Sequence, residues 1–416
     1  MARLLRSRNL LFLTLSSCIS QFGDRLTHMV IVTFIGIYNP GRIGAFSEFS
    51  FSFTLPVIIF APIAGVVVDH VSKRKVICNI HVIQALIIAL TPFFIRLTNS
   101  MLPIWFTVFL FFGLDIFNNS ARGAIIPSIV AREDILQANS ILIFGLRIAT
   151  FGGMVLGGLL IDWVGWHLGF YLDALTHFIA GMLALGMVMK GIEEKVPPLF
   201  YKDIANSLKQ FYKDLWELVI LLGRDRVVIF VITSVFILYF VAAVSYTILI
   251  YIVQQVLKLG SSGVGWLGGT IGIGQVLAAL LLGWLGKNLN RFLVIIISVT
   301  LLGLFFIVGQ FYVTTFLLFL ISFFAGIFFS FIGICQDTLL QEDVGGHIRG
   351  RIFSTKEFIA SASFLGSALL IGALSEFINY RALLFFVGIL LILLALFTFL
   401  IIPKAYLKKP TRVIPS

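Results

Sequence analysis

The feature that most constrains the fold of this chain is a series of twelve apolar runs. Each run is close to or longer than the roughly 20 residues needed to cross the hydrocarbon core of a bilayer. Short polar connections separate nearly all of them, so no soluble domain fits between two runs. The pattern predicts an all-α membrane protein with twelve transmembrane helices. The runs cover residues 10–38, 44–68, 76–95, 102–122, 137–164, 167–189, 227–257, 263–286, 292–310, 313–339, 352–376 and 380–402.

Composition excludes an ordinary water-soluble protein. Apolar residues make up 59% of the chain and charged residues 12%, whereas soluble globular chains are about 45–50% apolar and about 25% charged. The three cysteines lie far apart, in or next to apolar runs, so we expect neither a disulfide framework nor a metal site. Residues Leu15 to Cys18 resemble a lipoprotein cleavage box, but the apolar run continues to Tyr38, which favours a membrane helix over a cleaved signal.

The distribution of basic residues predicts the orientation in the membrane. The formal net charge is +11, and 24 of the 30 Lys and Arg residues fall on one side if the runs are helices. This bias follows the positive-inside rule, so we expect that side and both termini to be cytoplasmic. Because topology accounts for the basic excess, nucleic-acid binding is not expected.

The two halves of the sequence are similar to each other. Residues 117–158 overlay residues 331–372 without a gap at an offset of 214, and the turn after the second run matches the turn after the eighth at an offset of 218. Two parallel six-helix repeats imply a pseudo-two-fold axis along the membrane normal, with a central cavity between the halves. The predicted parts are an N-terminal six-helix bundle, a cytoplasmic linker and a C-terminal six-helix bundle, over residues 1–189, 190–226 and 227–416.

The linker carries its own pattern. Apolar residues recur every three or four positions from Phe200 to Leu222, with Lys202, Lys209 and Lys213 off that stripe. This spacing predicts an amphipathic helix in the cytoplasmic interface. A simple tether between the halves is compatible with the same pattern.

A loop motif follows the second run, where Gly65, Asp69 and Lys73 stand four residues apart and Arg74 follows directly. It resembles the loop signature of the major facilitator superfamily, although His70 and Lys73 each stand at a position where that signature usually has Arg. The resemblance implies that Asp69 and Lys73 latch a cytoplasmic gate in a twelve-helix transporter. A generic basic turn is the alternative.

The fifth run carries Gly153, Gly157 and Gly158, in a stretch similar to the antiporter motif of exporters in that superfamily. Ala149 stands where the motif has Gly, and Met154 where it has Pro, which removes a helix kink. A small-residue packing face would explain the glycines equally well. Further stretches resemble the macrolide-efflux and enterobactin-exporter branch: Phe22 to Asp24, Pro127 with Asn139 and Ser140, and Leu339 to Glu342 followed by Arg349 to Arg351.

Ionisable side chains in membrane spans are costly and are therefore functional candidates. Asp24 shares one helical face of the first run with Ser17, Gln21 and His28, and this polar stripe must avoid lipid. We hypothesise that Asp24 is the proton-coupling group, and a structural ion pair near Arg25 or Arg147 is the alternative. Candidates for the coupling site and substrate cavity are Asp24, Gln21, His28, Arg25, Asp115, Asn118, Asn119, Arg147 and Tyr246. Candidates for the cytoplasmic gate are Gly65, Asp69, Lys73, Arg74, Arg122, Gln336 and Asp337.

Three further expectations concern the placement of particular side chains. Asp115, Asn118, Asn119 and Arg122 fall on one face of the fourth run, and Arg147 is expected to pair with a carboxylate. His177 shares a face of the sixth run with Asp173 near the outer vestibule. Lone histidines more often have structural roles, so His177 is predicted to be structural.

The sequence thus predicts a proton-coupled exporter of small hydrophobic or amphiphilic compounds, in a bacterial inner membrane. Export of an endogenous metabolite such as a siderophore or lysolipid, and import or uniport, remain alternatives. No catalytic motif is present, so an enzyme is not expected, and the asymmetric charge argues against a channel. The resemblance implies a monomer without a bound cofactor or metal.

Overall fold

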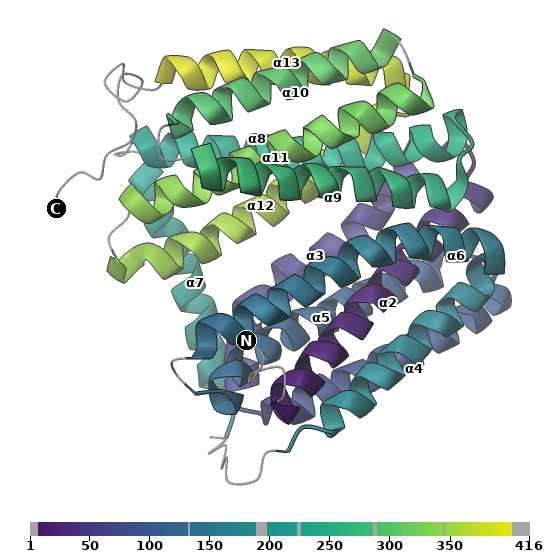
Figure 1. Ribbon diagram of the computed structural model, residues 1–416, viewed down its shortest axis with the longest axis vertical. Coiled ribbons are helices and arrows are strands. Elements are labelled where there is room, and N and C mark those ends of the chain that lie inside the picture. The colour runs from purple at the N-terminus through teal and green to yellow at the C-terminus, as the bar shows by residue number, and fades with distance from the viewer. Residues whose placement is uncertain are drawn as a thin grey trace. The chain divides into compact units, whose positions relative to one another are not determined.

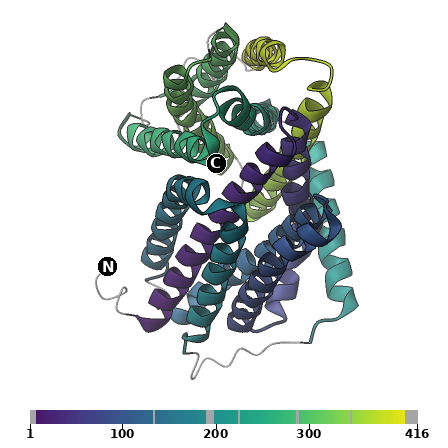
Figure 2. The same cartoon turned by 90° about the vertical axis from the view of Figure 1, so that its right-hand side faces the viewer.

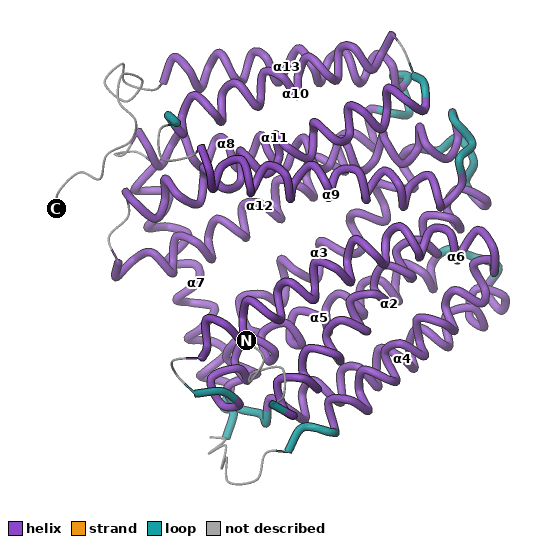
Figure 3. Tube along the Cα trace, viewed as in Figure 1, coloured by secondary structure: helices purple, strands orange, loops and turns teal. Residues whose placement is uncertain are grey.

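The computed structural model describes residues 7–131, 134–188, 198–222, 226–285, 289–311, 313–343 and 346–401. Helices make up nearly all of this part of the chain, and it contains no strand (Figure 3). The helices are α2 (Arg8–Tyr38), α3 (Ile43–Asp69), α4 (Lys73–Thr98), α5 (Leu102–Ile129), α6 (Ile135–Leu185), α7 (Tyr201–Leu222), α8 (Arg226–Tyr251), the π-helical segment η2 (Ile252–Val256), α9 (Gly260–Leu285), α10 (Arg291–Phe311), α11 (Thr315–Asp343), α12 (Gly346–Leu374) and α13 (Tyr380–Ile401).

The predicted all-α membrane fold is confirmed. Ten described helices are long and apolar enough to cross a membrane. Helix α6 is one of the ten but contains two of the predicted runs, which turn back on each other at Gly165, where φ is +79°. Helix α2 falls outside the ten because Gln21, Asp24 and Arg25 interrupt its apolar sequence. With α2 and both arms of α6, the described residues supply twelve spans.

The chain forms two compact units. The first contains Met1–Gly41, Phe51–Gln210 and Val253–Trp266, and the second contains Arg42–Ser50, Phe211–Ile252 and Leu267–Ser416. Each unit therefore includes a short segment from the other half of the sequence.

Helix α2 is central to the first unit, where it runs beside α6 in both views (Figures 1 and 2). In Figure 1 the dark purple α2 lies between the two arms of α6. Glycines on α6 allow the close approach: a Cβ at Gly153 would lie 2.9 Å from Cβ of Arg25, and one at Gly157 would lie 3.2 Å from Leu26. These two residues of the antiporter-like motif therefore pack against α2 at Arg25 and Leu26, the two residues that follow Asp24.

In the second unit, α10 and α13 lie side by side (Figure 1). A Cβ at Gly388 would lie 2.7 Å from the carbonyl oxygen of Gly303, so the two backbones meet at glycines. The first turns of α3 also belong to this unit, where Ser47 Oγ donates a hydrogen bond of 2.7 Å to the Ala368 carbonyl of α12.

Candidate functional site

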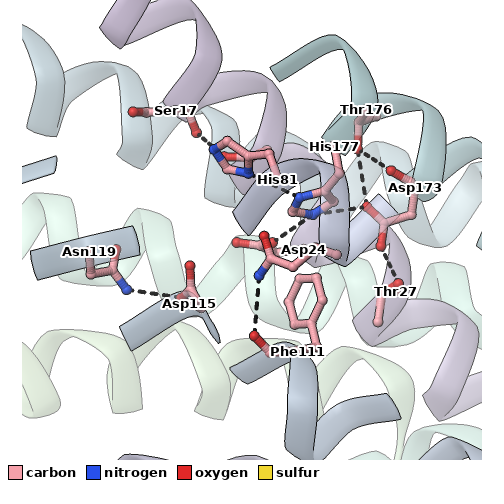
Figure 4. Close-up of polar contacts among 12 residues, drawn as sticks. Ser17, Asp24, Thr27, His81, Phe111, Asp115, Asn119, Asp173, Thr176 and His177 are labelled. Carbon is pink, nitrogen blue, oxygen red and sulfur yellow. Dashed lines mark hydrogen bonds and ion pairs between the residues drawn. The ribbon is translucent and has the colours of Figure 1, made fainter. Parts of the chain in front are cut away.

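The first unit contains a buried group of ionisable side chains, drawn in Figure 4. We call Asp24 and Thr27 of α2, His81 of α4, and Asp173 and His177 of α6 the polar cluster. His177 Nε2 lies 3.3 Å from Asp24 Oδ1 and 3.5 Å from Asp173 Oδ1. His177 Nδ1 lies 3.3 Å from His81 Nδ1. One imidazole thus faces two carboxylates on one edge and a second imidazole on the other.

Helical periodicity explains why these residues meet. Asp173 and His177 are one turn apart on the second arm of α6, so both point to the same neighbours. On α2, Asp24 and Thr27 lie on the face turned toward that arm, and the Thr27 hydroxyl donates a hydrogen bond to Asp173. Thr176 Oγ1 donates a further bond of 3.1 Å to the same carboxylate.

Gly23 makes this arrangement possible. A Cβ at this position would overlap the Thr176 hydroxyl and the Asp173 carboxylate. Any larger residue would therefore separate α2 from α6 at the level of the polar cluster. The sequence Gly23–Asp24 thus combines a close helix crossing with an ionisable group.

Exposure differs within the polar cluster. The side chains of Asp173 and His177 are 0% and 1% exposed, whereas Asp24 is 11% exposed. His81 is also buried. Asp24 is therefore the more exposed of the two carboxylates that face His177.

Hydrogen-bond chemistry limits the protonation states of the two histidines. To attract the carboxylates, His177 must carry a proton on Nε2. A neutral His177 then accepts at Nδ1 from His81. A doubly protonated His177 donates there instead, so His81 must be neutral with its proton on Nε2. The contact between the two imidazoles can therefore persist in both charge states of His177 only if His81 changes its tautomer.

A second polar group lies on α5. Asn119 Nδ2 donates a hydrogen bond of 2.9 Å to Asp115 Oδ2, and Arg122 donates to Asn119. Asn118 is buried, whereas Asn119 is exposed. Asp115, Asn119 and Arg122 thus form a short chain of contacts along one side of the helix.

The remaining cavity candidates are less closely connected. Gln21 and Arg25 are half-buried, and the stem of Arg25 packs on Gly153. Arg147 is exposed, and within the described part of the chain no ion pair joins it to Asp24 or Asp115. Tyr246 belongs to the second unit, where its ring lies 6.2 Å from Phe49 and 6.1 Å from Phe364. His28 is half-buried on α2.

The gate candidates lie in both units. In the first, the exposed Gly65 and Asp69 lie near the end of α3 and at its last residue, Lys73 begins α4, and Arg74 donates to the Leu185 carbonyl. In the second, Gln336 Nε2 donates a bond of 3.0 Å to Ser234 Oγ. Asp337 forms an ion pair with Lys356.

Four of the five members of the polar cluster were not among the functional residues predicted from the sequence. Asp173 and His177 were placed together on one face but near the outer vestibule, and Thr27 and His81 were not singled out. His81 and Gln84 stand three residues apart in a largely apolar run and are both buried. That spacing is the signal that would have indicated an interior polar face on α4.

Metal binding is not favoured by this geometry. Within the described residues, no group of three or more His, Cys, Asp or Glu side chains is arranged to hold a metal ion.

Curated relatives agree with a transport role. The "Putative bacilysin exporter BacE" of Bacillus subtilis (strain 168) is 26% identical over 330 residues, covering 77% of this chain and 76% of that protein. Its counterpart from Bacillus amyloliquefaciens is 25% identical, covering 72% of each chain. The "Uncharacterized MFS-type transporter YfmI" of Bacillus subtilis (strain 168) is 25% identical, covering 67% of each.

Solved structures share the fold. The nucleoside transporter NupG superposes with a TM-score of 0.76 at 14% identity, over 95% of this chain and all of that one (100%). An inward-facing bacterial homologue of the iron transporter ferroportin gives 0.70 at 14% identity, over 98% and 100%. The sequence profile of the Major Facilitator Superfamily matches residues 13–260 and 231–414. These matches span nearly the whole chain, so this multi-pass membrane protein belongs to the Major Facilitator Superfamily of secondary transporters.

Proposed function

We propose that this chain is a proton-coupled exporter of small amphiphilic compounds, in which the polar cluster binds the proton. The observation that carries the proposal is His177, a buried imidazole held between Asp24 and Asp173. Histidine changes charge near neutral pH, and ionisable groups inside a membrane bundle commonly serve proton relays. Asp24 provides the partly exposed entry.

Alternating access would couple this proton to the substrate. In transporters built from two repeats, one bundle rocks against the other around a site near the bilayer midplane. The polar cluster joins α2 to α4 and to the second arm of α6. A change in its charge would therefore alter how three spans of the first unit pack. The bias of basic residues supports cytoplasmic termini and an inner-membrane location.

The direction of transport rests on similarity. Two curated relatives at 25–26% identity carry the name "Putative bacilysin exporter BacE". Their naming for a single compound favours a second candidate, export of one defined metabolite rather than a range of drugs. Import or uniport by the same fold has weaker support, because Gly153 and Gly157 retain the glycines of the antiporter-like motif and pack on α2.

The test is proton-driven transport in liposomes containing the purified chain. Candidate substrates are the compounds of a panel that inhibit growth of a host lacking the protein more strongly than growth of the same host with it. Asp24→Asn and His177→Asn should abolish accumulation driven by a pH gradient while leaving counterflow exchange of the substrate. Glu48→Gln, which changes a carboxylate paired with Arg42 at the edge of the second unit, serves as the matched control. Unchanged coupling in both cluster variants would overturn the assignment of the proton site.

A further inference from the structure

Helix α7 lies against the end of α3. Ser207 Oγ donates a hydrogen bond of 2.7 Å to the carbonyl oxygen of Pro62, about two turns before α3 ends at Asp69. His70 Nε2 lies 3.7 Å from Asp203. Two turns of helix span roughly 11 Å, and each interfacial layer of a bilayer is roughly 5–8 Å thick. If the basic end of α3 is cytoplasmic and extends a few ångströms beyond the headgroups, the first half of α7 lies close to the cytoplasmic interface.

One face of α7 is held by the protein. Ile204, Leu208, Phe211 and Leu215 are partly buried at helical spacing. The ring of Phe211 lies 5.1 Å from the ring of Phe358 on α12, within the second unit. These contacts fix which way the helix is rotated.

The next face is aromatic and exposed. Tyr201 is 84% exposed, Tyr212 66% and Trp216 65%. At 100° per residue these three side chains fall within about 60° of the helix circumference. Tyrosine and tryptophan are enriched where membrane spans reach the headgroups, because their rings are apolar and their tips are polar.

A basic strip borders the aromatic face. Lys202 and Lys209 are exposed and lie two turns apart. The nearby carboxylate of Asp203 is turned toward His70 instead. The long lysine stems can follow the apolar surface while the ammonium groups reach the phosphate layer.

We propose that α7 is an interfacial helix whose aromatic strip enters the cytoplasmic leaflet and whose lysines bind the phosphates of anionic phospholipids. The order around the helix is protein contact, aromatic rings, then ammonium groups. This is the order expected when one side rests on a bundle and the other on a lipid surface. A linker that only crossed water would not be expected to expose these aromatic rings beside lysines.

Spin-label accessibility tests the depth of the helix. Asn206→Cys and Tyr212→Cys are each made in full-length protein in which Cys18, Cys78 and Cys335 are replaced, and each is labelled in phosphatidylcholine nanodiscs. The Tyr212 position should be relaxed mainly by oxygen, which partitions into lipid. The Asn206 position, on the exposed polar side, should be relaxed mainly by a water-soluble nickel chelate. Equal access of the nickel chelate to both positions would overturn the proposal.

A lipid titration tests the lysines. Nanodiscs of phosphatidylcholine with increasing phosphatidylglycerol should raise the unfolding temperature of the wild-type chain. Each lysine near an anionic membrane surface contributes about 1 kcal/mol of binding, which corresponds to about a five-fold change in affinity. In the variant Lys202→Gln/Lys209→Gln, the phosphatidylglycerol fraction that gives half of the stabilisation should therefore rise about five-fold for each lysine removed. Lys202→Arg/Lys209→Arg should behave as the wild type.

The outcomes are separable from the transport proposal because neither measurement requires transport. An identical titration for the glutamine and wild-type chains would overturn lipid binding by these lysines. So would a glutamine variant that responds normally to lipid but loses binding to a soluble protein, since the lysines would then serve that partner.

Discussion

The Asp162 carboxylate of α6 accepts a hydrogen bond of 2.9 Å from the backbone N–H of Ser261, the second residue of α9. Its other oxygen accepts a bond of 2.8 Å from the N–H of Ser262. The first N–H groups of a helix have no partner within the helix, and its N-terminal end is partially positive. A carboxylate from a distant segment therefore caps α9 and attaches its start to α6 within the first unit.

Asp162→Ala should release this attachment. Losing a helix cap costs about 0.5–2 kcal/mol, so local opening around Ser261 and Ser262 should become up to roughly thirty-fold more frequent. Hydrogen exchange of peptides spanning 258–264 measures this effect. Glu376→Gln, at the corresponding position of the second repeat, is the matched control. Equal exchange in wild type and Asp162→Ala would contradict the role of the cap.

Gly23→Ala should separate α2 from α6. A methyl group there would overlap the Thr176 hydroxyl and the Asp173 carboxylate, and overpacking of this kind costs about 1–3 kcal/mol. We expect a lower unfolding temperature in detergent and a loss of pH-gradient-driven transport. Gly152→Ala is the control, because a Cβ at Gly152 meets nothing within 4 Å. A Gly23→Ala chain as stable as the Gly152→Ala chain would argue against a required close approach.

Most of the helices were predictable because apolar length alone specifies a membrane span. The fifth and sixth of the twelve runs share the label α6, but they are two helical arms that meet at a sharp turn at Gly165, without a longer loop between them. The repeat offsets also have a structural counterpart. Gly158 packs on Ser261 at the start of α9, and its repeat partner Gly372 packs on Ser47 near the start of α3.

The polar cluster was only partly predictable. Periodicity identified Asp24 and its stripe, because a single helix suffices for that inference. The imidazole that faces Asp24, His177, comes from the far arm of α6, and its own partner His81 comes from α4. Identifying these residues therefore requires helix packing as well as spacing. Arg147 illustrates the converse: its charge suggested an internal partner, yet its side chain is exposed.

His81→Phe should change the pH dependence of transport without abolishing substrate exchange. A doubly protonated His177 donates from Nδ1 and needs an acceptor, which a phenyl ring does not provide. The neutral state also loses the bond that it accepts from His81, but a bond donated by a charged imidazolium is the stronger of the two. The protonated state therefore loses more, so a given transport rate should require a more acidic pH. Asp24 and Asp173 remain in place and keep the site functional. Rates measured across a pH series in liposomes check the shift, and His81→Gln, which can still accept, should preserve more of the original profile. Coincident profiles for wild type and His81→Phe would contradict the coupling of the two histidines.

The ion pair of Lys356 with Asp337 should respond asymmetrically to mutation. The Lys356 side chain is 7% exposed and that of Asp337 is 45% exposed. Asp337→Asn would leave a buried ammonium group without its carboxylate, and breaking a buried pair in this way costs up to about 3–5 kcal/mol. Lys356→Met would leave a carboxylate that water can solvate, so its cost should be smaller. Thermal unfolding of the two variants in detergent compares these costs directly, with the double variant as the reference. A Lys356→Met chain less stable than the Asp337→Asn chain would show that burial of the ammonium group does not dominate the energetics of this pair.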